Sequence, residues 1–514
     1  MKNNKLLRNI MAVTVVGVMA ATIVIAAIFA ACEKPEDALA TTTVAQEYEE
    51  TTEAPPPYEL TIVPAYETER IPANLPDYDW GGYTFRVLTG KKWVGSWAML
   101  NTRDITAEQE TGDAINDAVY KRNAILEGKY NFKIKQVVAS DVDAMETVNK
   151  AVSSGDHSFD AASQATSSVV RRIQSGYYVD LFGVRYLDFE KPWWDQGAVR
   201  DLSIGHRLYL TSGDFVLANK DLCPAILFNK QLLADLQLEN PYELVRGGKW
   251  TMGKLSEMSR AAAADLNGNG RMDIDADRFG YIHDNLPPNT YFLHGMGVRY
   301  TTKDADDMPV LIFGSERGFT AIQICADFAL SDFTRYFETL FIGEDDRSGT
   351  ELAFAENRGL FMGTVVTTAE TLRMMDTDFG ILPMPWLDES QREWGHSANN
   401  KYGESLVVPN FHDGEALERT GFMLEAIAAE SRYTVIPAYY DVQLKGKFAR
   451  DDESSDMLDI IFSSMVWDTG IVYDWFGFTR GIGVLRYNAS SFESERGAVE
   501  AAMRKTVDAI VNLE

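Results

Sequence analysis

The stretch GGYTFRVLTG, residues 81–90, gives the first indication of the fold class. Large apolar side chains at positions 83, 85 and 87 alternate with their neighbours before a glycine, and this period of two predicts a strand. The segments 113–126, 131–139, 143–153 and 158–164 then have the patterns of helix, strand, helix and strand. Strands and helices in this order predict an α/β sheet with right-handed crossovers.

Later segments continue the alternation. Residues 206–215 predict a hairpin, 225–236 a strand passing into a helix, and 248–264 a helix with Thr251 as its N-cap. Residues 359–375 predict a strand followed by a helix, 378–385 predict a strand, and the last hundred residues are largely helical. Because ligands of open α/β sheets bind beyond the carboxyl ends of the strands, the turns at 89–97 and 163–168 are candidate binding loops.

The chain begins with an export signal. Lys2, Lys5 and Arg8 precede an uncharged apolar run from 10 to 31, which predicts a signal sequence. An uncleaved transmembrane anchor is the alternative, because the run is long enough to span a bilayer. The stretch FAAC at 29–32 resembles the lipobox of bacterial lipoproteins, in which the cysteine is lipidated, although Phe29 replaces the usual leucine. Cys32 is therefore the expected lipidation site and first mature residue.

Length, charge and cysteine content narrow the possibilities further. A chain of 514 residues predicts two or three folded units. Loss of the three positive residues of the signal takes the formal net charge from −28 to about −31, which disfavours nucleic acid and anionic phospholipid as partners. After the signal, Cys223 and Cys325 remain, and they could form a disulfide or stay as two buried thiols.

The stretch DLNGNGRMDIDAD, residues 265–277, has the spacing of a calcium loop. Short oxygen-bearing side chains at alternate positions around a glycine turn can surround Ca²⁺ with hard ligands. Position twelve of the loop is Ala276, where a helix–loop–helix sensor needs glutamate, and no second helix follows. The pattern predicts a structural calcium clasp, with a solvated polar turn as the alternative. The predicted ligands are Asp265, Asn267, Asn269, the carbonyl of Arg271, and Asp273, with Asp275 or Asp277 completing the set.

Aromatic residues gather in loops that also hold prolines, glycines and carboxylates. Flat rings beside hydrogen-bonding groups suit sugars, whose apolar C–H faces are rimmed by hydroxyls, although core packing explains any single tryptophan equally well. The sequence contains no HExxH, GxSxG, Walker or CxxC motif, and its six histidines show no metal-like spacing. We therefore expect a protein that is not an enzyme.

Several blocks together resemble the extracellular solute-binding lipoproteins of carbohydrate ABC importers. They are the segment 228–259, which includes KWTMGKL, the calcium-like loop that follows it, and ILPMPWLDESQ, ESLVVPN and IPAYYD at 381–391, 404–410 and 436–441. Relatives that bind alginate oligosaccharides have a calcium loop that matches this one residue by residue at 265, 267, 269, 271 and 273. The acidic residue that follows in those relatives is Ile274 here.

The resemblance implies an α/β, two-lobe periplasmic-binding-protein-like fold of the class II type, with a hinge and a helical C-terminal segment. The implied organisation is a signal peptide at 1–31, a lipidated acidic flexible tether at 32–80, lobe 1 at 81–214 plus about 404–430, lobe 2 at 215–402 with the loop 265–277, and a helical tail at 431–514 packing across both lobes.

The resemblance also implies a function. The chain would be a monomeric receptor, anchored by lipid on the extracellular face of the cell membrane, that captures an oligosaccharide and delivers it to ABC permease subunits. A binder of peptide or another small polar solute is the alternative, followed by a surface glycoside hydrolase or lyase. The expected ligand contacts are Trp93, Gln164, Thr166, Trp193, Trp194, Asp214, Gly363, Thr364, Trp394 and Tyr439.

Overall fold

The computed structural model describes residues 58, 60, 62, 69–91, 103–141, 144–283, 289–337, 348–372, 375–399, 403–440, 452–477 and 489–513. All of them belong to one compact unit, Pro57–Glu514. The predicted signal peptide, the lipidation site Cys32 and the expected ligand contact Trp93 lie outside the described residues.

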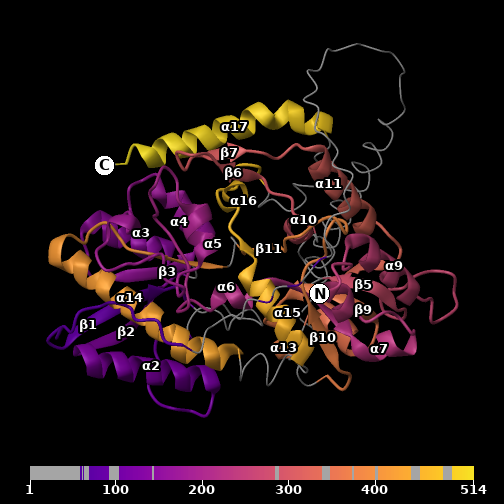
Figure 1. The fold of residues 1–514 in the computed structure, drawn as a ribbon, viewed down its shortest axis with the longest axis horizontal. Helices are drawn as coiled ribbons and strands as arrows, with labels where there is room; N and C mark the ends of the chain where they lie inside the picture. Colours follow the sequence, from indigo (N-terminus) through magenta and orange to yellow (C-terminus); the bar gives the residue numbers. More distant parts are fainter. Residues whose placement is uncertain are drawn as a thin grey trace, which may run out of the picture. The chain divides into compact units, whose positions relative to one another are not determined.

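The first sheet has the strand order β12-β3-β1-β2 (Figure 1). Strand β1 runs parallel to β2 and β3, whereas β12 joins the edge antiparallel to β3. The strands are β1 (Tyr83–Thr89), β2 (Phe132–Val138), β3 (Ala161–Ala165) and β12 (Glu404–Val407), and the connecting helices are α2 (Ala114–Tyr130), α3 (Met145–Ser154) and α4 (Thr166–Ile173). Asp113 caps α2 by accepting hydrogen bonds from the backbone N–H groups of Ile115 and Asn116.

The second sheet has the order β10-β4-β9-β5-β8, and its strand β4 is buried on both faces. Along β4, Ala225 and Leu227 enter one hydrophobic core while Ile226 and Phe228 enter another, as the alternation of side chains along a strand requires. The strands are β4 (Pro224–Asn229), β5 (Phe279–His283), β8 (Thr334–Tyr336), β9 (Gly359–Val365) and β10 (Phe379–Leu382). The helices around them are α7 (Lys230–Asp235), α8 (Pro241–Arg246), α9 (Met252–Ala262), α10 (Asn289–Gly295), α11 (Glu316–Ala329), α12 (Gly349–Ala355) and α13 (Thr368–Thr371).

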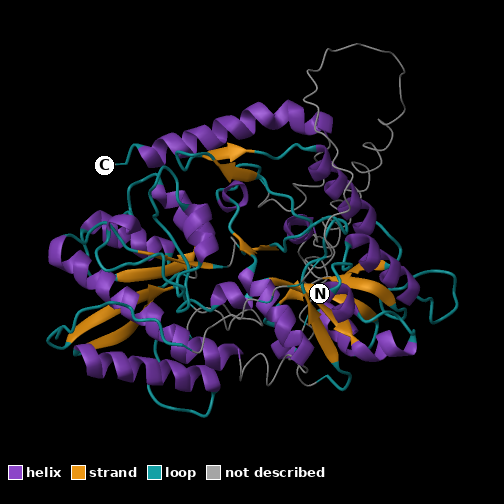
Figure 2. Cartoon of the chain, in the orientation of Figure 1, coloured by secondary structure: helices purple, strands orange, loops and turns teal. Residues whose placement is uncertain are grey.

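The chain passes between the sheets more than once (Figure 2). It leaves the first sheet through α5 (Gln196–Leu202) and α6 (Ala218–Asp221), and returns at β12. Helix α14 (Gly414–Pro437) then packs on α2, while α15 (Asp452–Ser463) packs on β10, so consecutive helices serve different sheets. The remaining elements are η2 (Leu181–Gly183), β6 (Thr301–Lys303), β7 (Pro309–Leu311), β11 (His396–Ser397), β13 (Met465–Val466), α16 (Thr469–Val472) and α17 (Ala489–Val511).

The structure confirms the strands and helices predicted within residues 81–164 and the cap of α9, whose first-turn N–H group donates to Thr251 Oγ1. The predicted hairpin at 206–215 is wrong. Leu208 accepts a hydrogen bond from Leu181, Thr211 pairs with Leu406, and Gly213 pairs with Trp194. The backbone groups of this segment therefore bond to three separate parts of the chain rather than to each other.

The sequence left open whether Cys223 and Cys325 form a disulfide and whether the chain has a transmembrane anchor. Cys223 and Cys325 are both free and buried. Burial raises the pKa of each thiol, which keeps both protonated. Among the residues that the structure describes, no helix has the length and apolarity of a membrane span.

Gly280 in β5 is required by the close approach of α9. A Cβ atom at this position would lie 1.9 Å from the backbone oxygen of Ser259, and backbone atoms cannot move aside as a side chain can. We expect Gly280→Ala to lower the free energy of unfolding by about 3 kcal/mol or more, measured by urea denaturation. Gly497→Ala in α17 is the control, because its Cβ would meet no atom within 4 Å and should be neutral or stabilising.

Candidate functional site

The turn after β3 is held by the returning strand β12. The N–H group of Thr166 donates to the Gly403 carbonyl at 2.9 Å, and its hydroxyl lies 2.8 Å from the Ser405 hydroxyl. Gln164, also buried, accepts a hydrogen bond from the Tyr178 hydroxyl at 3.0 Å. Both predicted ligand contacts therefore lie in a rigid turn at the carboxyl end of β3.

The two adjacent tryptophans are buried against α14. The indole N–H groups of Trp193 and Trp194 donate to the two carboxyl oxygens of Glu425, each at 2.9 Å. Burial raises the pKa of Glu425 to about 7, although these donors oppose the shift. Asp214 belongs to the same assembly, since its N–H donates to the Trp193 carbonyl and its carboxylate accepts from Arg432 at 3.0 Å.

Four charged or polar side chains meet where the chain crosses between the sheets, and we call them the crossover cluster: Arg103, Asp221, Glu370 and Tyr439. Asp221, at the end of α6, accepts hydrogen bonds from the Tyr439 hydroxyl at 2.8 Å and from the Arg103 guanidinium. Arg103 also lies 3.9 Å from the Glu370 carboxylate. The Arg103 and Glu370 side chains are 20% and 14% exposed, so polar groups of the cluster can reach a ligand.

The carboxyl end of β9 adjoins this cluster. The N–H group of Thr367 donates to the Asp221 carbonyl at 2.9 Å. Thr364 and Thr368 share a hydroxyl contact of 2.7 Å, and both Gly363 and Thr364 are partly exposed. Any larger residue at position 363 would require Tyr281 to move, because a Cβ there would lie 1.7 Å from the Tyr281 hydroxyl oxygen.

The structure thus brings most of the predicted ligand contacts into two neighbouring groups. Gln164, Thr166, Trp193, Trp194 and Asp214 lie on the side of the first sheet, while Gly363 and Thr364 lie on the second and connect through Asp221 to Tyr439. Trp394 is elsewhere, where its ring lies 4.6 Å from that of Trp386. Whether these residues touch a ligand stays a prediction.

Sequence reasoning missed Arg103, Asp221 and Glu370 as members of the site. The available signal was weak: Arg103 lies in the segment after the first strand, and Glu370 follows the glycine-containing strand 359–365. Asp221 sits in a four-residue helix that no hydrophobic period could indicate. Only the meeting of these distant segments distinguishes the three from 121 other charged residues.

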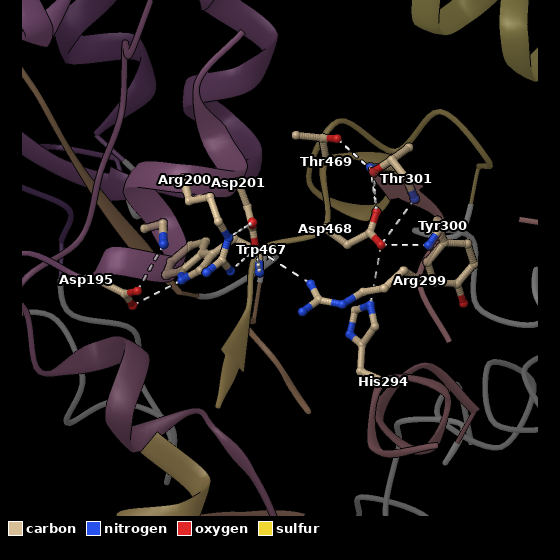
Figure 3. A network of polar contacts seen from close by, with 12 residues as sticks. Asp195, Arg200, Asp201, His294, Arg299, Tyr300, Thr301, Trp467, Asp468 and Thr469 are labelled. Atoms are coloured by element: carbon tan, nitrogen blue, oxygen red, sulfur yellow. Dashed lines mark hydrogen bonds and ion pairs between the residues drawn. The ribbon is translucent and has the colours of Figure 1, made fainter. Parts of the chain in front are cut away.

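A second polar junction joins α5 to the C-terminal part of the chain (Figure 3). The buried carboxylate of Asp468 accepts from the N–H of Tyr300 at 2.7 Å and from the hydroxyl of Thr301 at 2.7 Å. Burial raises the pKa of Asp468, but the nearby His294 and these donors outweigh it, so the pKa is below its ordinary value. Next to it, Trp467 donates its indole N–H to Asp195 at 3.0 Å.

Glu404 is a buried acid at the start of β12. The Ser163 hydroxyl donates to its Oε2 atom at 2.5 Å, whereas its Oε1 atom is buried with no hydrogen-bond partner. Burial raises the pKa of Glu404 to about 8, and the nearby carboxyl of Asp104 adds to the shift. A neutral carboxyl is the form that this environment favours.

The side chains of the predicted calcium loop hydrogen-bond to the loop's own backbone and to one another. The side chains of Asn267 and Asn269 both reach the Oδ2 atom of Asp273, and a turn of either amide would present its oxygen at the same point. Asp265 accepts from the N–H groups of Gly268 and Gly270, each at 2.7 Å. These two glycines have φ of +70° and +78°, the left-handed region that favours glycine.

The acidic residues that close the loop have different surroundings. Asp277 is buried, and N–H groups of Asp273, Leu266 and Asn267 hold the pKa of its carboxyl below the usual range. It therefore acts inside the loop as an organiser, whereas Asp275 is exposed. In the described part of the chain, no three His, Cys, Asp or Glu side chains group as metal ligands, so asparagine and carbonyl oxygens would have to complete the site.

Solved protein structures resemble this chain, whereas sequence comparisons find no match. No protein-family model matches the chain, and no curated protein matches it in sequence. UspC of M. tuberculosis superposes with a TM-score of 0.50 at 12% identity, over 82% of this chain and 100% of that one. A cyclo/maltodextrin-binding protein in complex with maltotetraose gives 0.50 at 12% identity, over 86% and 98%. The fold is that of the two-lobe periplasmic-binding-like proteins. The resemblance inferred from the sequence is therefore confirmed at the level of fold.

Glu404 predicts a specific pH dependence of stability. Because its pKa in the folded protein, about 8, lies above the ordinary 4.5, ionisation favours the unfolded chain as pH rises through this interval. We expect its contribution to stability to be full below pH 4.5 and to decline by on the order of 4 kcal/mol by pH 8. Urea denaturation from pH 4 to 9 should show a flatter profile for Glu404→Gln than for the wild type.

The control for this experiment is Glu418→Gln. The Glu418 side chain is 44% exposed and pairs with Arg185 at the surface, so its removal should leave the slope unchanged. Parallel profiles for wild type and Glu404→Gln would show that Glu404 does not titrate in this range.

Proposed function

We propose that this protein is a substrate-binding receptor that captures an extracellular carbohydrate for an ABC importer. The single observation that carries the proposal is the crossover cluster, in which side chains after β1, in α6, after β9 and at the end of α14 converge within a two-lobe fold. A ligand held there would contact elements that belong to both sheets. The structural neighbour in complex with maltotetraose supports an oligosaccharide as the ligand class.

The chemistry of the cluster suits an uncharged polyhydroxylated ligand. Arg103 is already paired with Asp221 and lies near Glu370, so its remaining N–H groups are held in place for hydrogen bonding. Carboxylates fixed in this way can accept hydrogen bonds from sugar hydroxyls without new ordering of the side chains. Such preorganisation lowers the entropic cost of binding.

The same proposal includes delivery of the ligand to a permease and attachment of the protein to the membrane. The ligand would pass to permease subunits in the membrane, and the protein would act as a monomer held on the extracellular face by lipid at Cys32. Support for this part comes from the export signal and the FAAC stretch. The neighbouring cyclo/maltodextrin-binding protein supports a chain that binds its ligand without turnover.

Calorimetry with a panel of neutral and acidic oligosaccharides, peptides and small polar solutes tests the proposal. We expect reversible binding of an oligosaccharide, weakened about tenfold in Thr364→Val because a hydroxyl at the edge of the site is lost. Thr302→Val is the matched control, since Thr302 is exposed on β6 outside the site. Binding of peptides alone, or cleavage products in the calorimeter cell, would contradict the receptor function.

We also propose that the loop 265–277 binds Ca²⁺ through Asp265, Asn267, Asn269, the Arg271 carbonyl and Asp273. Bound cation would relieve the apposition of Asp265 and Asp273 and fasten the end of α9 to β5. The loop lies between these two elements, so its effect would be on stability rather than on the choice of ligand.

Calcium removal tests this proposal directly. We expect EGTA to lower the melting temperature by a few degrees, as loss of a ligand specific for the folded state requires, and expect excess Ca²⁺ to restore it. Asp273→Ala should be insensitive to both treatments, whereas Asp306→Ala, in another exposed turn, should respond like the wild type. Loss of glycan binding on calcium removal with no change in melting temperature would contradict a bracing role.

A further inference from the structure

An aromatic notch on the side of the second sheet holds a tyrosine from the N-terminal segment. The ring of Tyr58 meets that of Trp386 edge to face, with centroids 4.9 Å apart and an interplanar angle of 84°. Trp394 lies against Trp386 and donates its indole N–H to the Tyr58 hydroxyl at 3.0 Å. Edge-to-face geometry and a donor matched to the hydroxyl are specific features of a tyrosine site.

Gly248 completes the notch, which we define as Gly248, Trp386 and Trp394. Its φ of +65° is in the region that favours glycine, and a Cβ atom there would lie 2.9–3.1 Å from three carbon atoms of Tyr58. The backbone at this position is thus shaped to the ring. Leu60, two residues further along, packs against the hydrophobic cluster that covers the same side of the second sheet.

A second anchor fixes the same segment to α14. The guanidinium of Arg70 lies 4.9 Å from the centroid of the Tyr433 ring and pairs with Glu430, while the N–H group of Ile71 donates to the Tyr433 hydroxyl at 2.7 Å. Helix α14 packs on α2, beside the first sheet. The two anchors therefore attach the N-terminal segment to elements of both sheets.

We propose that the notch is a docking site for the chain's own N-terminal segment, with Tyr58 as the recognised side chain. Burial raises the pKa of the Tyr58 hydroxyl, which keeps it neutral. Trp394 was expected to contact the ligand, but its indole N–H is used by Tyr58. The notch is therefore filled by protein, and a ligand could accept a hydrogen bond from the Trp394 indole only by displacing the Tyr58 hydroxyl.

The docking changes where the N-terminal segment leaves the folded body. The predicted tether extends to residue 80, whereas Tyr58 already lies in the notch. If the proposed lipid anchor at Cys32 is present, 25 residues lie between it and Tyr58, and this stretch spans at most ~90 Å when fully extended. The notch would then determine which part of the protein faces the membrane. The docking itself does not depend on the lipid or on the ligand.

Trypsin cleavage of the full-length protein tests the docking, because the sequence contains no Lys or Arg between Lys34 and Arg70. Cleavage after Arg70 requires local release of the segment, so its rate reports on the anchors. We expect Tyr58→Ala to accelerate this cleavage on the order of tenfold and Tyr58→Phe, which loses the hydroxyl alone, about threefold. Tyr120→Ala, at an exposed position of α2, is the control and should be unchanged.

A second measurement excludes general unfolding as the cause. The melting temperature of Tyr58→Phe should stay near that of the wild type. Trp394→Phe, which removes the indole donor together with part of the ring that packs on Trp386, should be cleaved at least as fast as Tyr58→Phe. Wild-type cleavage rates in Tyr58→Ala would overturn the proposal. Because the assay contains no sugar, its result is independent of whether glycan binding is found.

Discussion

The side-chain amide of Asn219 connects the two places where the chain crosses between the sheets. Its Nδ2 atom donates to the Glu404 carbonyl at 2.7 Å, and its Oδ1 atom accepts from the Glu404 N–H at 3.0 Å. Asn219 is fully buried in α6, and Glu404 opens the returning strand β12. Without this amide, a backbone donor and acceptor would be buried unpaired. The turn after β3 and the crossover cluster both depend on this junction, because β12 supports one and α6 carries the other.

Buried carboxyl groups in this protein differ in the direction of their pKa shifts. Asp468 accepts hydrogen bonds from Tyr300 and Thr301, and these donors together with His294 hold the pKa of its carboxyl below the ordinary value despite burial. Glu404 accepts from the Ser163 hydroxyl at one oxygen, its other oxygen has no partner among the described residues, and burial raises the pKa so that the neutral acid is favoured. A buried carboxyl group thus has a lowered pKa in one place and a raised pKa in another, according to the burial, charges and hydrogen-bond donors around it.

The aromatic residues show how far a pattern in sequence can be taken. Tryptophans beside prolines, glycines and carboxylates suggested sugar contacts, and that composition describes their loops correctly. The structure shows that Trp193 and Trp194 use their N–H groups on Glu425, more than 200 positions away, and Trp394 uses its own on Tyr58. An indole has one donor, so its partner largely settles its role, and that partner is not visible in the local sequence.

Sequence alone determined the local elements and, through the resemblance, the fold. Periods of two and 3.6 and capping residues such as Thr251 are short-range signals, and the strands and helices predicted within residues 81–164 and at 248–264 are present. It failed at 206–215, whose apolar residues suggested a hairpin although their partners lie in three other segments. Tertiary structure alone decided the crossover cluster, the neutral state favoured at Glu404 and the docking of Tyr58. Each depends on atoms brought together from distant segments, and hydrogen bonding and desolvation act over a few ångströms of space whatever the separation along the chain.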